Sequence, residues 1–284
     1  MALPTYHLRE NPVSRVLIVE DSAVFANLVK KEIEAKLGMT VVLTKSYAET
    51  QKLLNDMEEE NFFSEDNFFV AVLDLNLPDA PSGKIVDLVR SKNVPAIVFT
   101  AEFDDKIREM MWAKDIVDYV YKRGKLDVQY LVALIRRIHS NRSIKILVVD
   151  DSRVFRKKIC NLLEVHQYSV LAADDGAEAL KKIQENPTID LVITDYEMPN
   201  MDGFALTQKI REKHDKNEIA VIGVSAHGEH EIAVRFLKNG ANDFITKPFF
   251  TEEFYCRVTQ NVETIESFRR LKHVESELIR LRQN

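Results

Sequence analysis

The chain has 284 residues, 45% of them hydrophobic and 30% charged, and its formal net charge is −6. No apolar stretch is long enough to span a membrane, and the polar N-terminus lacks the apolar core of a secretory signal peptide. The net negative charge disfavours electrostatic binding of nucleic acid by the protein as a whole. Cys160 and Cys256 have no C-x-x-C partner, which favours idle or buried thiols in a reducing compartment. We therefore expect a cytoplasmic protein with no membrane or nucleic-acid partner.

The sequence contains two copies of one pattern. The segment 16–22, VLIVEDS, recurs 130 positions later as 146–152, ILVVDDS. An internal repeat in a chain with room for about two domains predicts tandem domains of one fold. The repeat divides the chain into an N-terminal tail, two domains and a C-terminal helix: 1–14, 15–140, 141–261 and 262–284.

In both copies, short runs of Val, Ile and Leu alternate with longer amphipathic stretches. Continuous apolar runs suit strands buried on both faces, and their alternation with helices predicts βαβ crossovers in a parallel sheet. The fold class is therefore α/β, with two doubly wound sheets. In copy two we expect strands at Lys145–Val149, Ser169–Ala172, Leu191–Thr194, Ala220–Val224 and Asp243–Ile245. We expect its helices at Val154–Glu164, Ala177–Asn186, Phe204–Lys213, Glu231–Asn239 and from Glu252 onward.

The connection between the two domains is short. Residues 139–143 are polar, and nothing longer separates the last helix of copy one from the first strand of copy two. We expect the helix to lead almost directly into the strand, which would limit the orientations available to the two domains.

The helical pattern does not stop at the end of copy two. Apolar residues recur every three or four positions at Val258, Val262, Ile265, Phe268, Leu271, Val274, Leu278 and Leu281. Such an a/d-type stripe over about three heptads is typical of a coiled coil. The part before residue 262 can pack on its own domain, but the remainder would outrun the ~20 Å core that it could cover. We therefore expect a parallel coiled-coil homodimer.

Each copy carries acids, a hydroxyl group and a lysine at the ends of successive apolar runs. These residues are Glu20, Asp21, Asp74, Thr100 and Lys122, and then Asp150, Asp151, Asp195, Ser225 and Lys247. They should converge, because the carboxyl ends of parallel strands meet at one edge of the sheet. Clustered carboxylates repel one another unless a cation joins them, and Mg²⁺ takes hard oxygen ligands while leaving positions for a phosphate oxygen. The pattern predicts a Mg²⁺-dependent carboxylate that accepts a phosphoryl group.

Copy two closely resembles the receiver domain of bacterial two-component response regulators. The matching segments are Asp150-Asp151, residues 195–203 (DYEMPNMDG), Ser225-Ala226 and Lys247-Pro248-Phe249. The resemblance implies a flavodoxin-like (βα)5 fold and transfer of a phosphoryl group from a histidine kinase or phosphotransfer protein. It makes Asp195 the phosphoacceptor, Phe244 the switch aromatic, and Ser225 and Lys247 the contacts to the phosphoryl group. It assigns Mg²⁺ to Asp150, Asp151, Asp195 and the carbonyl group of Glu197.

Copy one carries the same groups in altered loops. By the resemblance, Asp74 is its phosphoacceptor, Tyr119 its switch aromatic, and Thr100 and Lys122 its contacts to the phosphoryl group. Its metal-binding residues are Glu20, Asp21, Asp74 and Asn76. The changes are an insertion at 58–67, a longer loop at 78–83, a short step to Thr100 that predicts a short third helix, and Arg123 in place of a proline. All the reactive groups survive, so we expect an active site with altered kinetics and switching.

The order of two receivers and a coiled coil also resembles the input half of diguanylate cyclases that carry two receivers and a GGDEF domain. No Gly-Gly-Asp-Glu-Phe motif occurs here, so we expect either the regulatory part of such an enzyme or an adaptor that signals by contact. A DNA-binding regulator would need a helix-turn-helix, and the residues after copy two do not resemble one. A haloacid-dehalogenase-type phosphatase needs a D-x-D pair, whereas Asp195 is followed by Glu197. Copy two suits output control and copy one a modulator.

Overall fold

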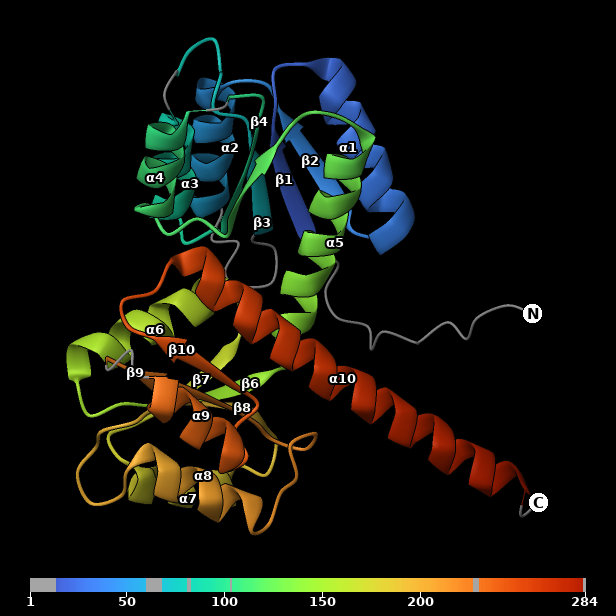
Figure 1. Ribbon diagram of the computed structural model, residues 1–284. Coiled ribbons are helices and arrows are strands. Elements are labelled where there is room, and N and C mark those ends of the chain that lie inside the picture. The colour runs from blue at the N-terminus through green and yellow to red at the C-terminus, as the bar shows by residue number, and fades with distance from the viewer. Residues whose placement is uncertain (1–13, 60–67, 81–82, 103, 227–229, 283–284) are drawn as a thin grey trace. The chain divides into compact units, whose positions relative to one another are not determined.

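The computed structural model describes two compact units, 1–139 and 140–284, and within them residues 14–59, 68–80, 83–102, 104–226 and 230–282. Each unit contains a five-stranded parallel sheet with helices on both faces (Figure 1). In both sheets the first strand lies between the second and the third, followed by the fourth and fifth. This is the strand order of the flavodoxin-like doubly wound fold. The expected fold class is therefore confirmed for both units.

Unit 1 alternates strands and helices as expected. Its strands are β1 (Arg15–Val19), β2 (Thr40–Thr44), β3 (Phe68–Leu73), β4 (Ala96–Thr100) and β5 (Asp118–Tyr121). Its helices are α1 (Ala23–Leu37), α2 (Tyr47–Glu59), α3 (Lys84–Ser91), α4 (Asp105–Trp112) and α5 (Lys125–Asn141). The third helix is eight residues long, in agreement with the short step before Thr100. The insertion at 58–67 and the loop at 78–83 lie partly outside the described residues.

Unit 2 contains every element predicted for copy two, with ends that shift by at most two residues. Its strands are β6 (Lys145–Val149), β7 (Ser169–Ala173), β8 (Ile189–Asp195), β9 (Ala220–Ser225) and β10 (Asp243–Thr246). Its helices are α6 (Arg153–Val165), α7 (Gly176–Glu185), α8 (Gly203–Arg211), α9 (His230–Lys238) and α10 (Thr251–Arg282). All six residues of β9 are buried, because helices cover both faces of the parallel sheet.

Short polar side chains set where several helices begin. Asp104, Ser152, Asp175 and Asp202 occupy N-cap positions, and each side chain accepts a hydrogen bond from a backbone N–H group of the first turn. These bonds satisfy donors that have no partner inside the helix. Asp175 and Asp202 therefore fix the starts of the two helices that follow β7 and β8.

The carboxyl ends of the strands form the edge at which the candidate residues lie. β1 has β2 on one side and β3 on the other, and β6 lies in the same way between β7 and β8. The chain direction across the sheet reverses at β1 and β6, and loops diverge at such a switch point to leave room for a ligand. The acid pairs follow β1 and β6, and the single aspartates lie at the ends of β3 and β8.

The junction between the repeats is as short as its sequence predicts. α5 ends at Asn141 and β6 begins at Lys145. Asn141 is fully buried, and its carbonyl oxygen accepts a hydrogen bond of 2.9 Å from the backbone N–H of Ile144.

No helix within the described residues has an apolar stretch long enough to cross a membrane.

The long helix α10 presents two different apolar faces. Val258, Val262 and Ile265 are buried against unit 2, whereas Leu271 and Val274 are exposed. The nine residues from Ile265 to Val274 make about two and a half turns, so the two sets lie on opposite sides of the helix. The single stripe expected from the sequence is therefore two stripes, an inner one that packs on the sheet and an outer one that faces solvent.

Candidate functional site

Three carboxylates meet at the carboxyl edge of the unit 2 sheet. One oxygen each of Asp150, Asp151 and Asp195 lie within 4.8 Å of one another. Asp150 is buried, Asp195 is half-buried and Asp151 is exposed. The ammonium group of Lys247 donates hydrogen bonds of 2.8 Å to Asp150 Oδ2 and to Asp195 Oδ1. One cationic side chain therefore faces three acidic ones, and the cluster has a formal excess of negative charge.

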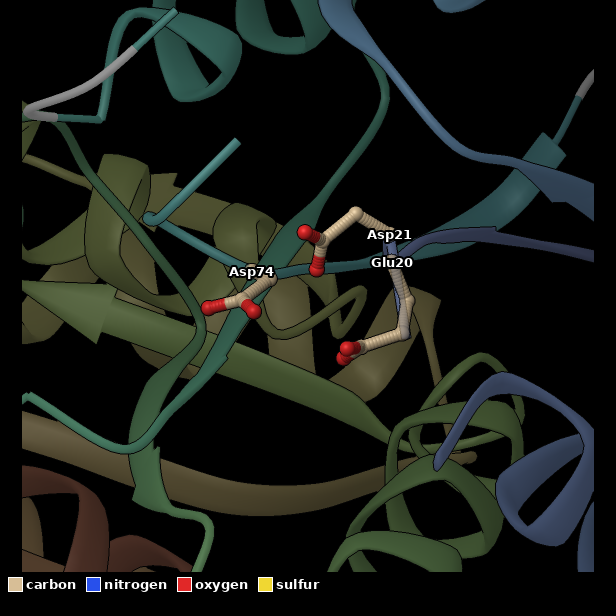
Figure 2. A group of neighbouring side chains, drawn as sticks. All are labelled: Glu20, Asp21 and Asp74. Carbon is tan, nitrogen blue, oxygen red and sulfur yellow. The ribbon is translucent and has the colours of Figure 1, made fainter. Parts of the chain in front are cut away.

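Unit 1 builds the same cluster from Glu20, Asp21 and Asp74, and Figure 2 shows their side chains at the ends of β1 and β3. Lys122 donates hydrogen bonds of 2.5 Å to Glu20 Oε2 and 2.8 Å to Asp74 Oδ2. The Lys122 side chain is 6% exposed, compared with 14% for Lys247. Lys122 is therefore more enclosed in unit 1 than Lys247 is in unit 2.

The hydroxyl groups lie at the same edge. Thr100 and Ser225 are the last residues of β4 and β9, and both are buried. The backbone N–H groups of Lys122 and Lys247 donate 2.8 Å hydrogen bonds to the carbonyl groups of Thr100 and Ser225. Each lysine is therefore anchored to its hydroxyl residue by the backbone, in the same way in both units.

Burial at the cluster affects the acids directly. Burial raises the pKa of the Asp195 carboxyl group above its ordinary value of 3.8, against the lowering effect of Lys247. Burial likewise raises the pKa of Glu20 above 4.5, and Lys122 opposes that rise. In both units one lysine only partly offsets the loss of hydration, because desolvation penalises the charged form of a carboxyl group.

A hollow of about 490 Å³ opens beside the acids of unit 2. It is lined by Asp151, Tyr196, Glu197, Met198, Pro199 and Asp202. Asp151 and Glu197, two of the predicted metal-binding residues, therefore share one open space. In unit 1 the corresponding residue, Asn76, follows Asp74 closely, and its backbone N–H donates a 3.4 Å hydrogen bond to Asp74 Oδ1.

The two predicted switch aromatics differ in burial. Tyr119 is 6% exposed, and its hydroxyl group donates a 3.2 Å hydrogen bond to the Glu102 carbonyl group. Burial raises the pKa of Tyr119 to about 12. Phe244 is only half-buried, with its ring centroid 5.6 Å from that of Phe236. The side chains at these equivalent positions therefore occupy different environments in the two units.

Sequence reasoning missed aromatic rings that pack against the lysines. The Lys247 ammonium lies 3.8 Å from the ring centroid of Phe155, and the Lys122 ammonium lies 5.1 Å from that of Phe25. A cation is attracted to the face of an aromatic ring. Phe25 and Phe155 are 130 positions apart, the period of the repeat, and this match was the signal that could have revealed them.

The acidic residues fit a magnesium ion. Each cluster brings together carboxylate oxygens, the hard ligands that Mg²⁺ prefers, around a single cationic side chain. Each cluster includes one exposed acid, Asp21 or Asp151, so bound water can reach it. A divalent cation would balance the remaining formal charge of the three acids and the lysine.

We expect Asp195→Asn to stabilise the metal-free protein near neutral pH. A pKa raised in the folded state means that the folded chain loses stability relative to the unfolded chain as pH rises above the ordinary value of 3.8. The melting temperature of the variant should therefore exceed that of the wild type by an amount that grows as pH rises above 3.8 and levels off once pH passes the raised pKa of Asp195. Mg²⁺ should raise the wild-type value by about 2–4 °C for each kcal/mol of binding free energy.

Differential scanning fluorimetry with EDTA and then with Mg²⁺ measures both effects. Asp202→Asn is the control, because Asp202 is an exposed N-cap that lines the hollow but lies outside the acid cluster. A wild type that melts above Asp195→Asn in EDTA at every pH would contradict the expected cost of burying the charged Asp195 carboxylate.

Comparison with known proteins identifies the family. The response regulator receiver domain profile matches residues 146–259. The chain is 39% identical over 103 residues to the two-component response regulator ORR5 of Oryza sativa subsp. japonica, a match that covers 36% of this chain and 77% of ORR5. It is 39% identical over 107 residues to chemotaxis protein CheY1 of Helicobacter pylori (strain J99 / ATCC 700824), covering 37% of this chain and 86% of CheY1.

Two solved structures resemble both units together. Each is a two-component system response regulator/GGDEF domain protein, and each match covers 89% of this chain and 99% of the other. The TM-scores are 0.75 and 0.74, at 35% and 36% sequence identity. In this chain, the two five-stranded sheets have the same strand order, and each carries three acidic residues, a hydroxyl residue and a lysine at its carboxyl edge. The chain belongs to the response regulator receiver family of two-component signalling proteins.

Proposed function

We propose that the chain is a tandem receiver module in which Asp195 and Asp74 accept phosphoryl groups from a histidine kinase or phosphotransfer protein. The observation that carries this proposal is the contact of one lysine with two clustered carboxylates in each unit. A carboxylate held in this way is a nucleophile with a cation already placed beside it.

The transfer step uses an oxygen of Asp195. This carboxylate oxygen forms a bond to phosphorus while the bond from phosphorus to the donor's histidine nitrogen breaks, and the electron pair returns to that nitrogen. The hydroxyl group of Ser225 and the ammonium group of Lys247 contact the phosphoryl oxygens. Asp150, Asp151, Asp195 and the Glu197 carbonyl would hold Mg²⁺, which would supply positive charge to stabilise the negative charge that develops during transfer. Asp74, Thr100 and Lys122 act in the same way in unit 1.

The two acceptors have unequal roles in this proposal. Unit 2 keeps the family's spacing and continues directly into α10, so it controls output. In unit 1, Glu20 replaces an aspartate, Arg123 replaces a proline, and Lys122 is more enclosed than Lys247. These differences suit a modulator whose phosphorylation is slower.

The output is the association of two copies through the outer face of α10. Leu271, Val274, Leu278 and Leu281 are between 50% and 73% exposed and recur with a, d, a, d spacing. Arg270 and Glu275 then fall at g and e positions, where a parallel, in-register dimer places opposite charges across the interface. A second copy of the chain is therefore the partner of this face.

The two structural relatives support a proposal for the destination of the signal. Both are response regulator/GGDEF domain proteins that match this chain across both units. Dimerisation of α10 would bring two attached output domains together, as regulation of a diguanylate cyclase requires. We therefore propose that this module regulates such an enzyme.

Phosphorylation itself can be tested with acetyl phosphate and Mg²⁺. Intact mass spectrometry should detect up to two added phosphoryl groups, and borohydride trapping followed by peptide mapping should assign them to Asp195 and Asp74. Asp195→Asn should remove the phosphoryl group that is added faster, and Asp74→Asn the one that is added more slowly. Phosphorylation at neither residue, in a folded protein supplied with Mg²⁺, would overturn the proposal.

A further inference from the structure

A guanidinium group ties together two loops beside the acid cluster of unit 2. Arg156, in the second turn of α6, donates a hydrogen bond through Nη1 to the backbone carbonyl group of Asp150. Its Nη2 lies 2.6 Å from Asp174 Oδ1, in the loop between β7 and α7. The Arg156 side chain is only 14% exposed. The residue therefore joins the backbone that carries Asp150 and Asp151 to the neighbouring loop.

The same β7–α7 loop also makes hydrogen bonds to the loop that follows Asp195, on the other side of the site. Asn200 Nδ2 donates a 2.7 Å hydrogen bond to Asp175 Oδ2, and the Gly176 N–H donates a 3.3 Å hydrogen bond to the Met201 carbonyl group. A Cβ atom on Gly176 would lie 2.8 Å from that carbonyl oxygen, so glycine permits the close approach. Asp174, Asp175 and Gly176 thus connect the loop of Asp150 with the loop that follows Asp195.

Unit 1 lacks the arginine tie. Ala26 occupies the position equivalent to Arg156, and Lys45 occupies that of Asp174, as the matching backbone hydrogen bonds of Lys45 to Glu49 and Asp174 to Glu178 indicate. In unit 1 a different contact fastens the β3–α3 loop, because Asp79 accepts 2.9 Å hydrogen bonds from two backbone N–H groups at the start of α2. The chain therefore contains its own comparison for the effect of Arg156.

We propose that Arg156 is a positioning residue that preorganises the metal-binding acids of unit 2. Three clustered carboxylates repel one another, so without a cation the loop bearing Asp150 and Asp151 tends to move away from Asp195. An arginine bonded to the backbone of that loop resists this movement and does not take up any carboxylate oxygen of the cluster. Unit 2 should therefore bind Mg²⁺ more tightly than unit 1. This inference rests on the proposed phosphoacceptor function.

The test is a Mg²⁺ titration of the full chain, in which hydrogen exchange is measured separately for a peptide from each unit. The peptide spanning 146–156 reports on unit 2 and that spanning 16–26 on unit 1. Arg156→Ala should raise the half-saturating Mg²⁺ concentration of unit 2 about tenfold, a typical loss when support around a metal site is removed. The value for unit 1 should not change.

Conservative variants separate positioning from folding. Arg156→Lys can keep one of the two contacts and should give an intermediate Mg²⁺ affinity. Asp174 is 74% exposed, so Asp174→Asn should have a smaller effect, and it should add little in the Arg156→Ala background. An unchanged Mg²⁺ half-saturation in Arg156→Ala, even with a lower melting temperature, would reduce Arg156 to a purely structural residue and overturn the proposal.

Failure of this inference differs from failure of the proposed function. If acetyl phosphate modifies Asp195 equally well in wild type and Arg156→Ala at every Mg²⁺ concentration, Asp195 is an acceptor but Arg156 does not position its site. If Asp195 is never modified although Mg²⁺ binds unit 2 and Arg156→Ala weakens that binding, the positioning role stands and the phosphoacceptor function falls.

Discussion

Asp195→Asn is expected to abolish the effect of phosphorylation on the association of the chain. In the wild type, acetyl phosphate or beryllofluoride with Mg²⁺ should change the dimer dissociation constant at least about fivefold, the lower end of typical coupling between two sites. The variant keeps the size of the side chain and can still accept a hydrogen bond from Lys247, but an amide cannot form the acyl phosphate. Sedimentation velocity across a concentration series, with and without the phosphate mimic, measures the change.

The route that we propose from Asp195 to α10 runs through β10. In the proposed mechanism, a phosphoryl group on Asp195 would draw Ser225 and Lys247 toward it, and the half-buried Phe244 could then move inward. The residue before it, Asp243, accepts a 2.9 Å hydrogen bond from Arg257 and one of 3.5 Å from Asn261, both on α10. A shift of β10 would therefore act directly on the helix that carries the outer apolar face.

Asp74→Asn is the matched control, since it makes the same chemical change in the other unit. We expect the phosphate mimic to keep most of its effect on association in this variant, because Asp195 is intact. If Asp74→Asn alone removes the response, unit 1 controls the output and the assignment of roles is reversed.

The fold and the acid clusters could be predicted because each is encoded in local order along the chain. Buried runs such as β9 mark parallel strands, and in such a sheet the residue that ends a strand necessarily lies at the carboxyl edge. Asp195 and Lys247 therefore had to meet, although 52 residues separate them. The internal repeat places each of these residue types twice, at matching positions.

Other features depend on side-chain geometry that spacing alone does not reveal. Arg156 has no motif of its own, and its partners are a backbone carbonyl group and an exposed aspartate on another loop. The apolar spacing along α10 looks continuous, but several successive steps of three, from Val262 to Val274, rotate the stripe around the helix. Only the burial of each side chain separates the inner face from the outer one.

The outer face of α10 gives the second large prediction. Leu278→Glu should weaken the dimer at least about thirtyfold, equivalent to about 2 kcal/mol, because each charge would be buried at an a position against its copy. Ile279→Glu is a closely matched control. Leu278 and Ile279 are 53% and 51% exposed, yet Ile279 lies about 100° around the helix, outside the stripe. The control should associate like the wild type, as measured by sedimentation equilibrium.

Substitutions on the inner face of α10 should affect the stability of unit 2 rather than the association of two chains. Ile265→Ala removes a buried side chain that packs on unit 2, so it should lower the stability of that unit by about 2–5 kcal/mol rather than act through the interface. If Leu278→Glu lowers the melting temperature of the monomer as strongly as Ile265→Ala does, the outer face packs within one chain, and the proposed dimer is wrong.

Cross-linking decides the direction of the two helices. With Cys160 and Cys256 changed to serine, Val274→Cys places one thiol at a d position of each chain. In a parallel, in-register pair the two d positions face each other closely enough for a disulfide, whereas an antiparallel pair sets residue 274 against a different residue. Rapid oxidation to a covalent dimer is expected, and Ile279→Cys should cross-link slowly. A parallel pair is also the arrangement that carries both chain ends in the same direction, so this one bond tests whether α10 can bring two output domains together.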